Sequence, residues 1–358
     1  MRAVFYPYKN DSNRHIDILK KEIEKNNVYL YDIKNIKKIQ QWKDIDGIYL
    51  NWFESIYNDN FIKYYYNVIK KLSLLILWKI LHIKIIFVFH NTFPHDCKYK
   101  SITRFFIHCY LKIADKIVIL SRSSKEKLTK YLNKTDINKK VIYIPLPNYI
   151  DSYSRNVNKI PIIPHCSRPF NVLFIGAVRP YKNVELLINT SDIFNKAEFV
   201  IAGRTSSREY EYDLNLLIKN KRFHNLKTHF QFISDEQMIQ MILNADILAL
   251  PYNIDSSLNS GTALLAFSLG RTVICPKIGT VQDISDQSLV FSYSYSDSKE
   301  EKENFLHQMN NAYNMFLYEN DKFNMLGQKL LVEMKNNNNP EYIGKRFAEI
   351  LIGRKERR

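Results

Sequence analysis

Residues 245–280 read ADILALPYNIDSSLNSGTALLAFSLGRTVICPKIGT and predict a strand, a loop, a helix and a second strand. The apolar runs 247–250 and 273–275 are the expected strands, and the apolar segment 263–269 between them is the expected helix. The polar loop after the first strand ends in Asn259-Ser260-Gly261-Thr262. In doubly wound sheets, ligands bind beside such loops, at the carboxyl ends of the strands.

The Ser-Gly-Thr turn at 260–262 supports two interpretations. The first backbone N–H groups of a helix have no carbonyl partner within the helix, so they can bind an anion such as a phosphate. The alternative is an ordinary helix cap, because Ser and Thr cap helices in any α/β protein. Residues elsewhere in the chain favour the anion site.

The whole chain of 358 residues alternates short apolar runs with amphipathic segments, which predicts an α/β protein with two parallel-sheet domains. We expect an N-terminal domain over 1–150 and a C-terminal domain over 170–335. Residues 151–169 lack periodicity and contain three prolines, so we interpret them as the linker. A last helix and a basic tail within 340–358 are expected to pack back toward the N-terminal domain.

The expected elements follow the apolar pattern. Strands are expected at 3–6, 28–31, 47–50, 84–90, 116–120, 141–144, 171–175, 198–202, 228–232, 247–250 and 273–275. Helices are expected at 15–26, 61–82, 102–113, 123–132, 184–189, 212–219, 235–243, 263–269, 299–331 and 341–352.

Positive charge is concentrated in the first domain. Residues 1–150 contain 27 Lys and Arg against 13 Asp and Glu, whereas residues 151–358 contain 25 against 23. A basic domain suits nucleic acid, anionic lipid or an anionic substrate. The alternative is a general bias toward lysine, but such a bias would affect both parts of the chain.

The spacing of the cysteines and the length of the apolar runs indicate in which cellular compartment the protein is expected. Cys97, Cys109, Cys166 and Cys275 show no CxxC spacing, and the opening MRAVFYPYKN lacks the apolar core of a signal peptide. We therefore expect reduced thiols in a cytoplasmic protein. The most apolar run, 72–78, is far shorter than the roughly 20 residues of a membrane span. There is no HxxxH arrangement and no evident metal cluster, so no metal or cofactor is expected.

Three loops of the second domain each follow an apolar strand. We therefore expect all three to lie at the same edge of the sheet. Gly176 and Gly203 allow close approach of the backbone to a ligand. The cations Arg179 and Lys182 follow Gly176, and Arg204 follows Gly203. The third loop ends in Asn259, Ser260, Gly261 and Thr262. Two cations and a helix N-terminus match the charge of a diphosphate. For any one cation alone, a solvated surface charge is the alternative.

The segments FIGAVRPYKN, IAGR, ADILALPY and NSGTALLAFSLGRTVI, in this order, resemble the C-terminal domain of GT-B glycosyltransferases. The resemblance is to group 4 and related polysaccharide-assembly enzymes, and nearly the whole chain fits two Rossmann-like domains. It implies a nucleotide-sugar co-substrate, with Arg179 and Lys182 holding its diphosphate. It also implies that Ser260, Gly261 and Thr262 donate hydrogen bonds to that diphosphate.

The chain departs from this family at one point. Many group 4 enzymes have two glutamates eight positions apart, which contact the donor sugar and the nucleotide ribose. Here no glutamate lies between Glu236 and Glu300, and the aligned positions are Ser257 and Leu265. Those two roles therefore do not transfer. Asp255 and Asn259 are the nearest polar candidates for a contact with the sugar.

Catalytic candidates in the first domain follow the strand 84–90. His90 ends that strand, and the segment HNTFPHD, which includes His95 and Asp96, resembles the acceptor-side loop of some bacterial members. An inverting transferase needs a general base, and histidine suits that role near neutral pH. The alternative for His90 is a structural histidine bonded to backbone. Glu54, in the segment NWFE that is similar to the same subgroup, could be the base or position the acceptor; its alternative is a surface carboxylate.

Acceptors in this class are often lipid-linked sugars at the cytoplasmic membrane face. The expected helix 61–82 combines tyrosines and Trp78 with lysines, which suits an anionic membrane surface, or else a core helix with a solvated lysine face. We therefore expect a cytoplasmic, peripherally membrane-associated, metal-independent glycosyltransferase of surface polysaccharide synthesis with a glycan or glycolipid acceptor. The alternatives are a sugar-nucleotide epimerase of the same fold, or a non-catalytic protein that binds lipid or nucleic acid. No recognised nucleic-acid motif is present.

Overall fold

The computed structural model describes residues 1–10, 14–56, 60–94, 97–153, 168–220, 225–254 and 256–353. The chain forms two compact units: Met1–Pro147 with Asn338–Arg358, and Asn148–Asn337. Each unit is an α/β domain with its own six-stranded parallel sheet. Most of the expected linker, 154–167, lies outside the described residues.

The sheet of the first unit has the order β2-β1-β3-β4-β5-β6. Its central strands are apolar along their whole length because helices cover both faces of a parallel sheet. The strands are β1 (Arg2–Tyr6), β2 (Tyr29–Tyr31), β3 (Gly47–Asn51), β4 (Lys84–Phe89), β5 (Lys116–Ile119) and β6 (Val141–Tyr143). The helices are α1 (His15–Glu24), α2 (Ile39–Trp42), α3 (Phe61–Ile80), α4 (Lys100–Ile113), α5 (Ser124–Lys127), α6 (Lys134–Lys140) and α15 (Pro340–Ile352), with short 3₁₀ turns η1 (Ile33–Asn35) and η2 (Leu128–Lys130).

The sheet of the second unit has the order β12-β11-β10-β7-β8-β9. The strands are β7 (Phe170–Ile175), β8 (Ala197–Ala202), β9 (Leu226–His229), β10 (Ile247–Ala249), β11 (Thr272–Pro276) and β12 (Phe291–Tyr293). The helices are α7 (Ile150–Tyr153), α8 (Val184–Ser191), α9 (Arg208–Lys219), α10 (Asp235–Asn244), α11 (Gly261–Ser268), α12 (Gly279–Gln282), α13 (Ser298–Tyr318) and α14 (Asn320–Asn337), with 3₁₀ turns η3 (Pro180–Lys182) and η4 (Gln287–Leu289).

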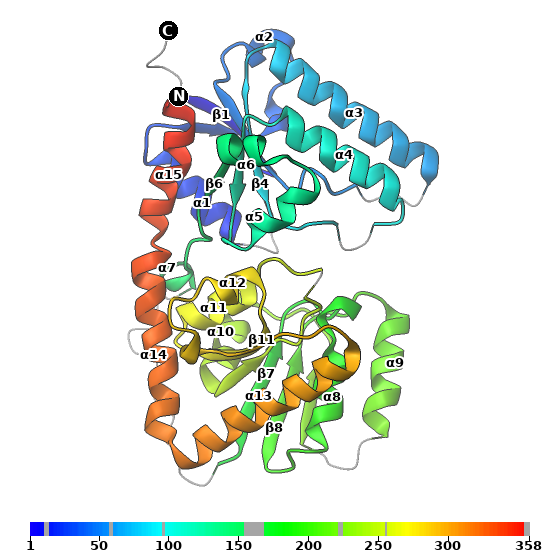
Figure 1. Cartoon of the computed structure of the whole chain (residues 1–358), viewed down its shortest axis with the longest axis vertical. Coiled ribbons are helices and arrows are strands. Elements are labelled where there is room, and N and C mark those ends of the chain that lie inside the picture. Colours follow the sequence, from blue (N-terminus) through cyan, green and yellow to red (C-terminus); the bar gives the residue numbers. More distant parts are fainter. Residues whose placement is uncertain are drawn as a thin grey trace. The chain divides into compact units, whose positions relative to one another are not determined.

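The C-terminal helix α15 packs within the first unit, against α1 (Figure 1). Gly344 permits this contact, since a Cβ atom there would lie 2.4 Å from the Cβ of Glu22. The Tyr49 hydroxyl on β3 donates a hydrogen bond of 2.8 Å to the carbonyl of Phe347. The last helix thus completes the core of the first unit.

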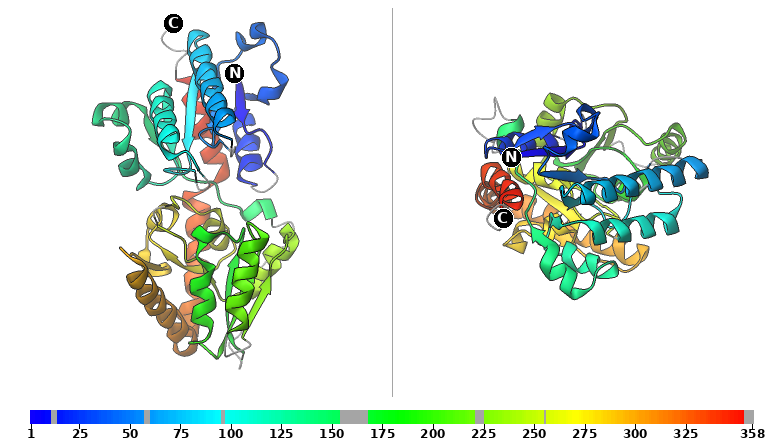
Figure 2. Two further views of the ribbon diagram at one scale, coloured as in Figure 1. Left: turned by 90° about the vertical axis from the view of Figure 1, so that its right-hand side faces the viewer. Right: turned by 90° about the horizontal axis from the view of Figure 1, so that it is seen from above.

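On the other side of the same unit, α3 and α4 lie side by side (Figures 1 and 2). The buried side of α3 presents Tyr64, Val68, Leu75 and Trp78 to the core. Its N-cap is Asn60, whose side chain accepts a hydrogen bond of 3.1 Å from the amide of Lys63. The opposite side of α3 is exposed and is described below.

Several expected elements differ from the structure. The helix expected at 299–331 is two helices, because Glu319 leaves helical geometry between α13 and α14. The strand expected at 228–232 is β9, which starts at Leu226 and ends at His229. The helix expected at 123–132 shortens to α5 and the turn η2. Strand β12 and helix α6 are not in the sequence prediction, because each is a short segment without clear periodicity.

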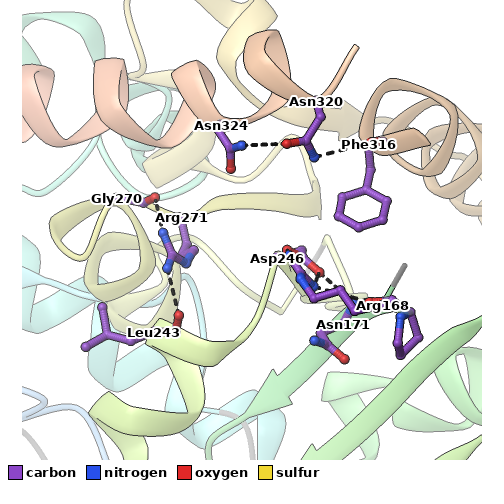
Figure 3. A network of polar contacts seen from close by, with 10 residues as sticks. Arg168, Asn171, Leu243, Asp246, Gly270, Arg271, Phe316, Asn320 and Asn324 are labelled. Atoms are coloured by element: carbon purple, nitrogen blue, oxygen red, sulfur yellow. Dashed lines mark hydrogen bonds and ion pairs between the residues drawn. The ribbon is translucent and has the colours of Figure 1, made fainter. Parts of the chain in front are cut away.

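A polar network closes the amino-terminal edge of the second sheet (Figure 3). Arg168 makes two hydrogen bonds of 2.5 and 2.6 Å to the carboxylate of Asp246, which also accepts 2.8 Å from the amide of Asn171. Arg271 donates to the carbonyls of Leu243 and Gly270. Burial lowers the pKa of Arg271 to about 10. This network joins the starts of β7 and β10 at the edge opposite the predicted ligand site.

Candidate functional site

The ligand edge of the second unit lies where the strand order reverses, between β7 and β10. Open α/β sheets bind ligands outside the carboxyl ends of the strands at this point. The loops after β7, β8 and β10, singled out in the sequence, meet there. The contacts between these loops are described next.

The loops after β7 and β8 run side by side. The amide of Val178 donates to the carbonyl of Arg204 at 2.9 Å, and the amide of Ser206 donates back to Val178 at 2.9 Å. Gly176 and Gly203 have positive φ angles of 130° and 140°. A Cβ atom on Gly203 would lie 1.8 Å from the carbonyl oxygen of Gly176, so only glycine fits there.

The half-buried Arg179 and the exposed Arg204 line one pocket of about 700 Å³. Residues after β9 form its far side, among them Phe232, whose side chain is 79% exposed. Glu211, on helix α9, is the acidic member of the lining. The pocket therefore offers three guanidinium groups, with Arg208 as the third, beside the rings of Phe230 and Phe232.

The N-terminus of α11 shows the helix cap, which is one of the two interpretations of the Ser-Gly-Thr turn. Ser260 is the N-cap, and its hydroxyl accepts a hydrogen bond of 3.1 Å from the amide of Ala263. Gly261 is exposed and Thr262 is half-buried. A Cβ atom on Gly176 would lie 3.5 Å from the Thr262 hydroxyl, so the loop after β7 touches the start of α11.

Lys182 lies on this edge over an aromatic ring. Its ammonium nitrogen is 3.4 Å from the ring centroid of Tyr252, a cation–π contact. Burial lowers the pKa of Lys182 below its usual value. The amide of Asn253 donates 2.8 Å to the carbonyl of Tyr181, which joins the Lys182 turn to the loop after β10. Lys182 is thus held beside the start of α11 rather than spread into solvent.

In the first unit, the strand order reverses between β1 and β3, and His90 and Asn51 meet near this edge. The Nε2 atom of His90 lies 2.9 Å from Oδ1 of Asn51, whose Nδ2 donates 3.1 Å to the carbonyl of Tyr6. The ring of Trp52 stacks on the ring of His90, with 3.9 Å between the two ring centroids. The backbone of Trp52 has a positive φ of 49°. Burial, and secondarily the nearby His15, lower the pKa of His90 well below its usual value. His90 is therefore neutral at pH 7.

Glu54 is a core residue, so the alternative of a surface carboxylate is wrong. Its side chain is 1% exposed, and neither carboxyl oxygen has a hydrogen-bond partner among the described residues. Burial raises its pKa to about 7, an effect that the nearby Lys71 partly offsets. Lys71 itself donates to the carbonyls of Phe53 and Ser55, at 2.5 and 2.9 Å.

The other candidates have different outcomes. His95, Asp96 and Asp255 lie outside the described residues. Asn259 is half-buried in the loop before α11. The positions of the two family glutamates, Ser257 and Leu265, are both buried. Across the described ranges, no three His, Cys, Asp or Glu residues are placed to hold a metal ion.

Sequence reasoning missed the residues that hold the candidates in place. Asn51, Trp52 and Tyr252 each contact a predicted site residue. All three lie in the segments NWFE and ADILALPY. Their position at or shortly after the carboxyl ends of β3 and β10 was the available signal, but aromatic and amide side chains at a strand end have many structural uses.

Comparison with known proteins agrees with this geometry. Residues 158–287 match the family described as glycosyl transferases group 1. Among solved structures, Anabaena HepE in complex with UDP-glucose is 13% identical, with a TM-score of 0.70 over 99% of this chain and 100% of that chain. Sucrose-phosphate synthase from Thermosynechococcus elongatus is 12% identical, with a TM-score of 0.72 over 98% and 97%. A comparison with curated protein sequences finds no significant match.

The two parallel sheets and these likenesses define the GT-B fold, as the sequence predicts. The chain is a glycosyltransferase, and its residues 158–287 match glycosyl transferases group 1. This finding favours the transferase over the epimerase and over a non-catalytic binding protein.

Proposed function

We propose that the chain transfers a sugar from a nucleoside diphosphate donor bound at the ligand edge of the second unit. Two observations support this most: Arg179 and Arg204 line one pocket at this edge, and Lys182 lies on the ring of Tyr252, whose hydroxyl contacts the N-cap Ser260 of α11. Such a site favours two or more negative charges. The solved structure of HepE, to which this chain is similar in fold, is a complex with UDP-glucose.

Catalysis would rest on stabilising the leaving group, the diphosphate of the nucleotide. As the bond between sugar and phosphate breaks, negative charge develops on the departing diphosphate. Cations and helix N–H groups that already face that charge stabilise the transition state more than the ground state. Lys182 would exchange its contact with the Tyr252 ring for a phosphate oxygen. Arg179 and Arg204 would hold the diphosphate, with the nucleoside in the adjoining pocket near Phe232.

His90 would act through one defined nitrogen. Because Nδ2 of Asn51 donates to Tyr6, Oδ1 of Asn51 faces His90 and accepts from it, which places the ring proton of His90 on Nε2. Nδ1 is then the basic atom of the neutral ring. We propose that this atom serves the acceptor hydroxyl, with Asn51 as its positioning residue.

The proposed acceptor is a glycan or a lipid-linked sugar of surface polysaccharide synthesis, used at the inner face of the plasma membrane. The exposed side of α3 supports a membrane contact. We call it the α3 surface; it consists of Phe61, Ile62, Tyr65, Tyr66, Ile69, Ile76 and Ile80, interspersed with Lys63, Lys70 and Lys79. Exposed apolar side chains among lysines suit an anionic lipid surface. None of the described helices combines the length and apolar character of a membrane span.

The double substitution Arg179→Ala with Lys182→Ala tests the donor site. Transfer from any nucleotide sugar should be abolished, while the circular dichroism spectrum and melting temperature stay near those of the wild type. Lys227→Ala with Lys299→Ala, at exposed lysines of the same unit, is the matched control and should keep full activity. Full activity in the Arg179/Lys182 variant would refute the assignment of the donor site.

A further inference from the structure

Tyr149 lies along helix α11, at the point where the chain enters the second unit. Its amide donates a hydrogen bond of 3.1 Å to the hydroxyl of Ser268, the last residue of α11. Its own hydroxyl oxygen lies 3.4 Å from where a Cβ atom on Gly261 would stand. Eight helical residues span about 12 Å, so the Tyr149 side chain runs back along the helix and ends at its N-terminus.

The hydroxyl of Tyr149 has no hydrogen-bond partner in the part of the chain that the structure describes. The residue is nevertheless only 5% exposed. Its hydroxyl oxygen is not among the fully buried polar atoms without a partner in the described ranges, so this oxygen is open to water or to a ligand. Tyr252 shows the contrast, since its hydroxyl lies 3.4 Å from Ser260 and accepts from it.

The donors around Tyr149 are also unused. The amides of Gly261 and Thr262 open the helix and have no carbonyl partner within it. The next amide, of Ala263, is already bonded to the Ser260 hydroxyl. Since Gly261 is exposed, a ligand from solvent can reach these two amides. Two N–H groups and one phenol therefore lie together at an open site.

We propose that the Tyr149 hydroxyl donates a hydrogen bond to the diphosphate bound at the start of α11. This inference rests on the proposed donor site and adds a binding residue from outside the three loops. Burial raises the pKa of Tyr149 above its usual value, so the phenol keeps its proton. It therefore stabilises negative charge as a donor without adding a charge of its own.

Tyr149→Phe tests the proposal, because it removes one oxygen and keeps the ring. The ligands are UDP, GDP, ADP and CDP, with inorganic pyrophosphate as the probe that has no base and uridine as the probe that has no phosphate. We expect the variant to bind its preferred nucleoside diphosphate and pyrophosphate about 10- to 150-fold more weakly, as for loss of a hydrogen bond to a charged group. Uridine affinity and the melting temperature without ligand should not fall.

Tyr110→Phe is the matched control. Tyr110 is a fully buried tyrosine of the first unit whose hydroxyl also has no partner among the described residues. Its substitution should leave all affinities unchanged. If a folding defect lay behind the effect of Tyr149→Phe, uridine binding would fall together with diphosphate binding, and the proposal would be overturned.

The outcomes separate this proposal from the function on which it rests. If a nucleoside diphosphate binds the wild type and Tyr149→Phe binds it within twofold as tightly, Tyr149 has no role and the donor site stands. If no nucleoside diphosphate binds the wild type, the donor site fails, and pyrophosphate alone decides whether Tyr149 contacts an anion. If pyrophosphate does not bind either, both proposals are wrong.

Discussion

In the residue pair Asn51 and His90, the place of Asn51 on its strand determines which ring nitrogen of His90 carries the proton. Asn51 is the last residue of β3, and its amide group is fixed by the carbonyl of Tyr6 at the end of β1. His90 follows β4, the next strand of the sheet. Strand neighbours thus decide which nitrogen of His90 carries hydrogen.

Asn51→Asp tests this pair. A carboxylate at the same place would favour the charged imidazolium and raise the pKa of His90 by about 1 to 3 units. Histidine signals in nuclear magnetic resonance spectra, followed through a pH titration, measure the shift. Transfer should fall at pH values below the raised pKa of His90, since a protonated His90 cannot accept a proton. An unchanged His90 titration would show that the two side chains do not interact as described.

Glu54 predicts a dependence of stability on pH. Its pKa is about 7 in the folded protein and 4.5 in its ordinary state. Between these values the unfolded chain releases the proton and the folded chain keeps it, so the free energy of unfolding decreases as pH rises from about 4.5 to 7. A raised carboxyl pKa of this size corresponds to about 3 kcal/mol.

Glu54→Gln should remove this decrease. Urea unfolding at pH 5 and at pH 7 measures the free energy of unfolding of both proteins, and the variant should gain relative to the wild type at the higher pH. Comparing the two proteins cancels the titration of their shared groups. An equal difference between them at both pH values would contradict the burial of an unpaired carboxyl group.

At the scale of elements, the apolar runs predicted most strands because strands of a parallel sheet are buried on both faces. The segment KIIFVF is buried at every position as β4. The same reasoning missed β12, which has only three residues, and it joined α13 to α14 because Glu319 carries no signal of a break. The three loops of the ligand edge were predictable because each follows an apolar strand: two continue with a glycine and a cation, and the third ends at the Ser-Gly-Thr turn. The contacts of Tyr149 and Asn51 were not, because they join segments far apart in the sequence.

The α3 surface gives the prediction at this scale. Ile62→Ser with Tyr66→Ser should weaken sedimentation with vesicles that contain phosphatidylglycerol by at least about tenfold, since each buried apolar side chain contributes roughly 1.5–3 kcal/mol. Ile193→Ser with Tyr318→Ser removes two equally exposed side chains of the second unit and should have no effect. Equal sedimentation of the α3 variant and the wild type would refute the membrane contact.

At the scale of the whole molecule, charge divides between the two units more sharply than the sequence halves indicated. With residues 338–358 included, the first unit contains 33 Lys and Arg against 16 Asp and Glu, whereas the second contains 19 against 20. A compositional bias toward lysine would not leave one unit neutral. The basic unit also carries the α3 surface, so its attraction to anionic vesicles should weaken as salt is added. The neutral unit has Arg179, Lys182 and Arg204 at the proposed donor site.

The central claim is that the second unit binds a nucleoside diphosphate. A thermal-shift panel of UDP, GDP, CMP and their sugars measures this directly, because a ligand that binds the folded state raises the melting temperature. The account predicts a concentration-dependent rise with at least one nucleoside diphosphate and its sugar, and none with the Arg179→Ala and Lys182→Ala double variant. No rise with any member of the panel, or an equal rise in that variant, would contradict it.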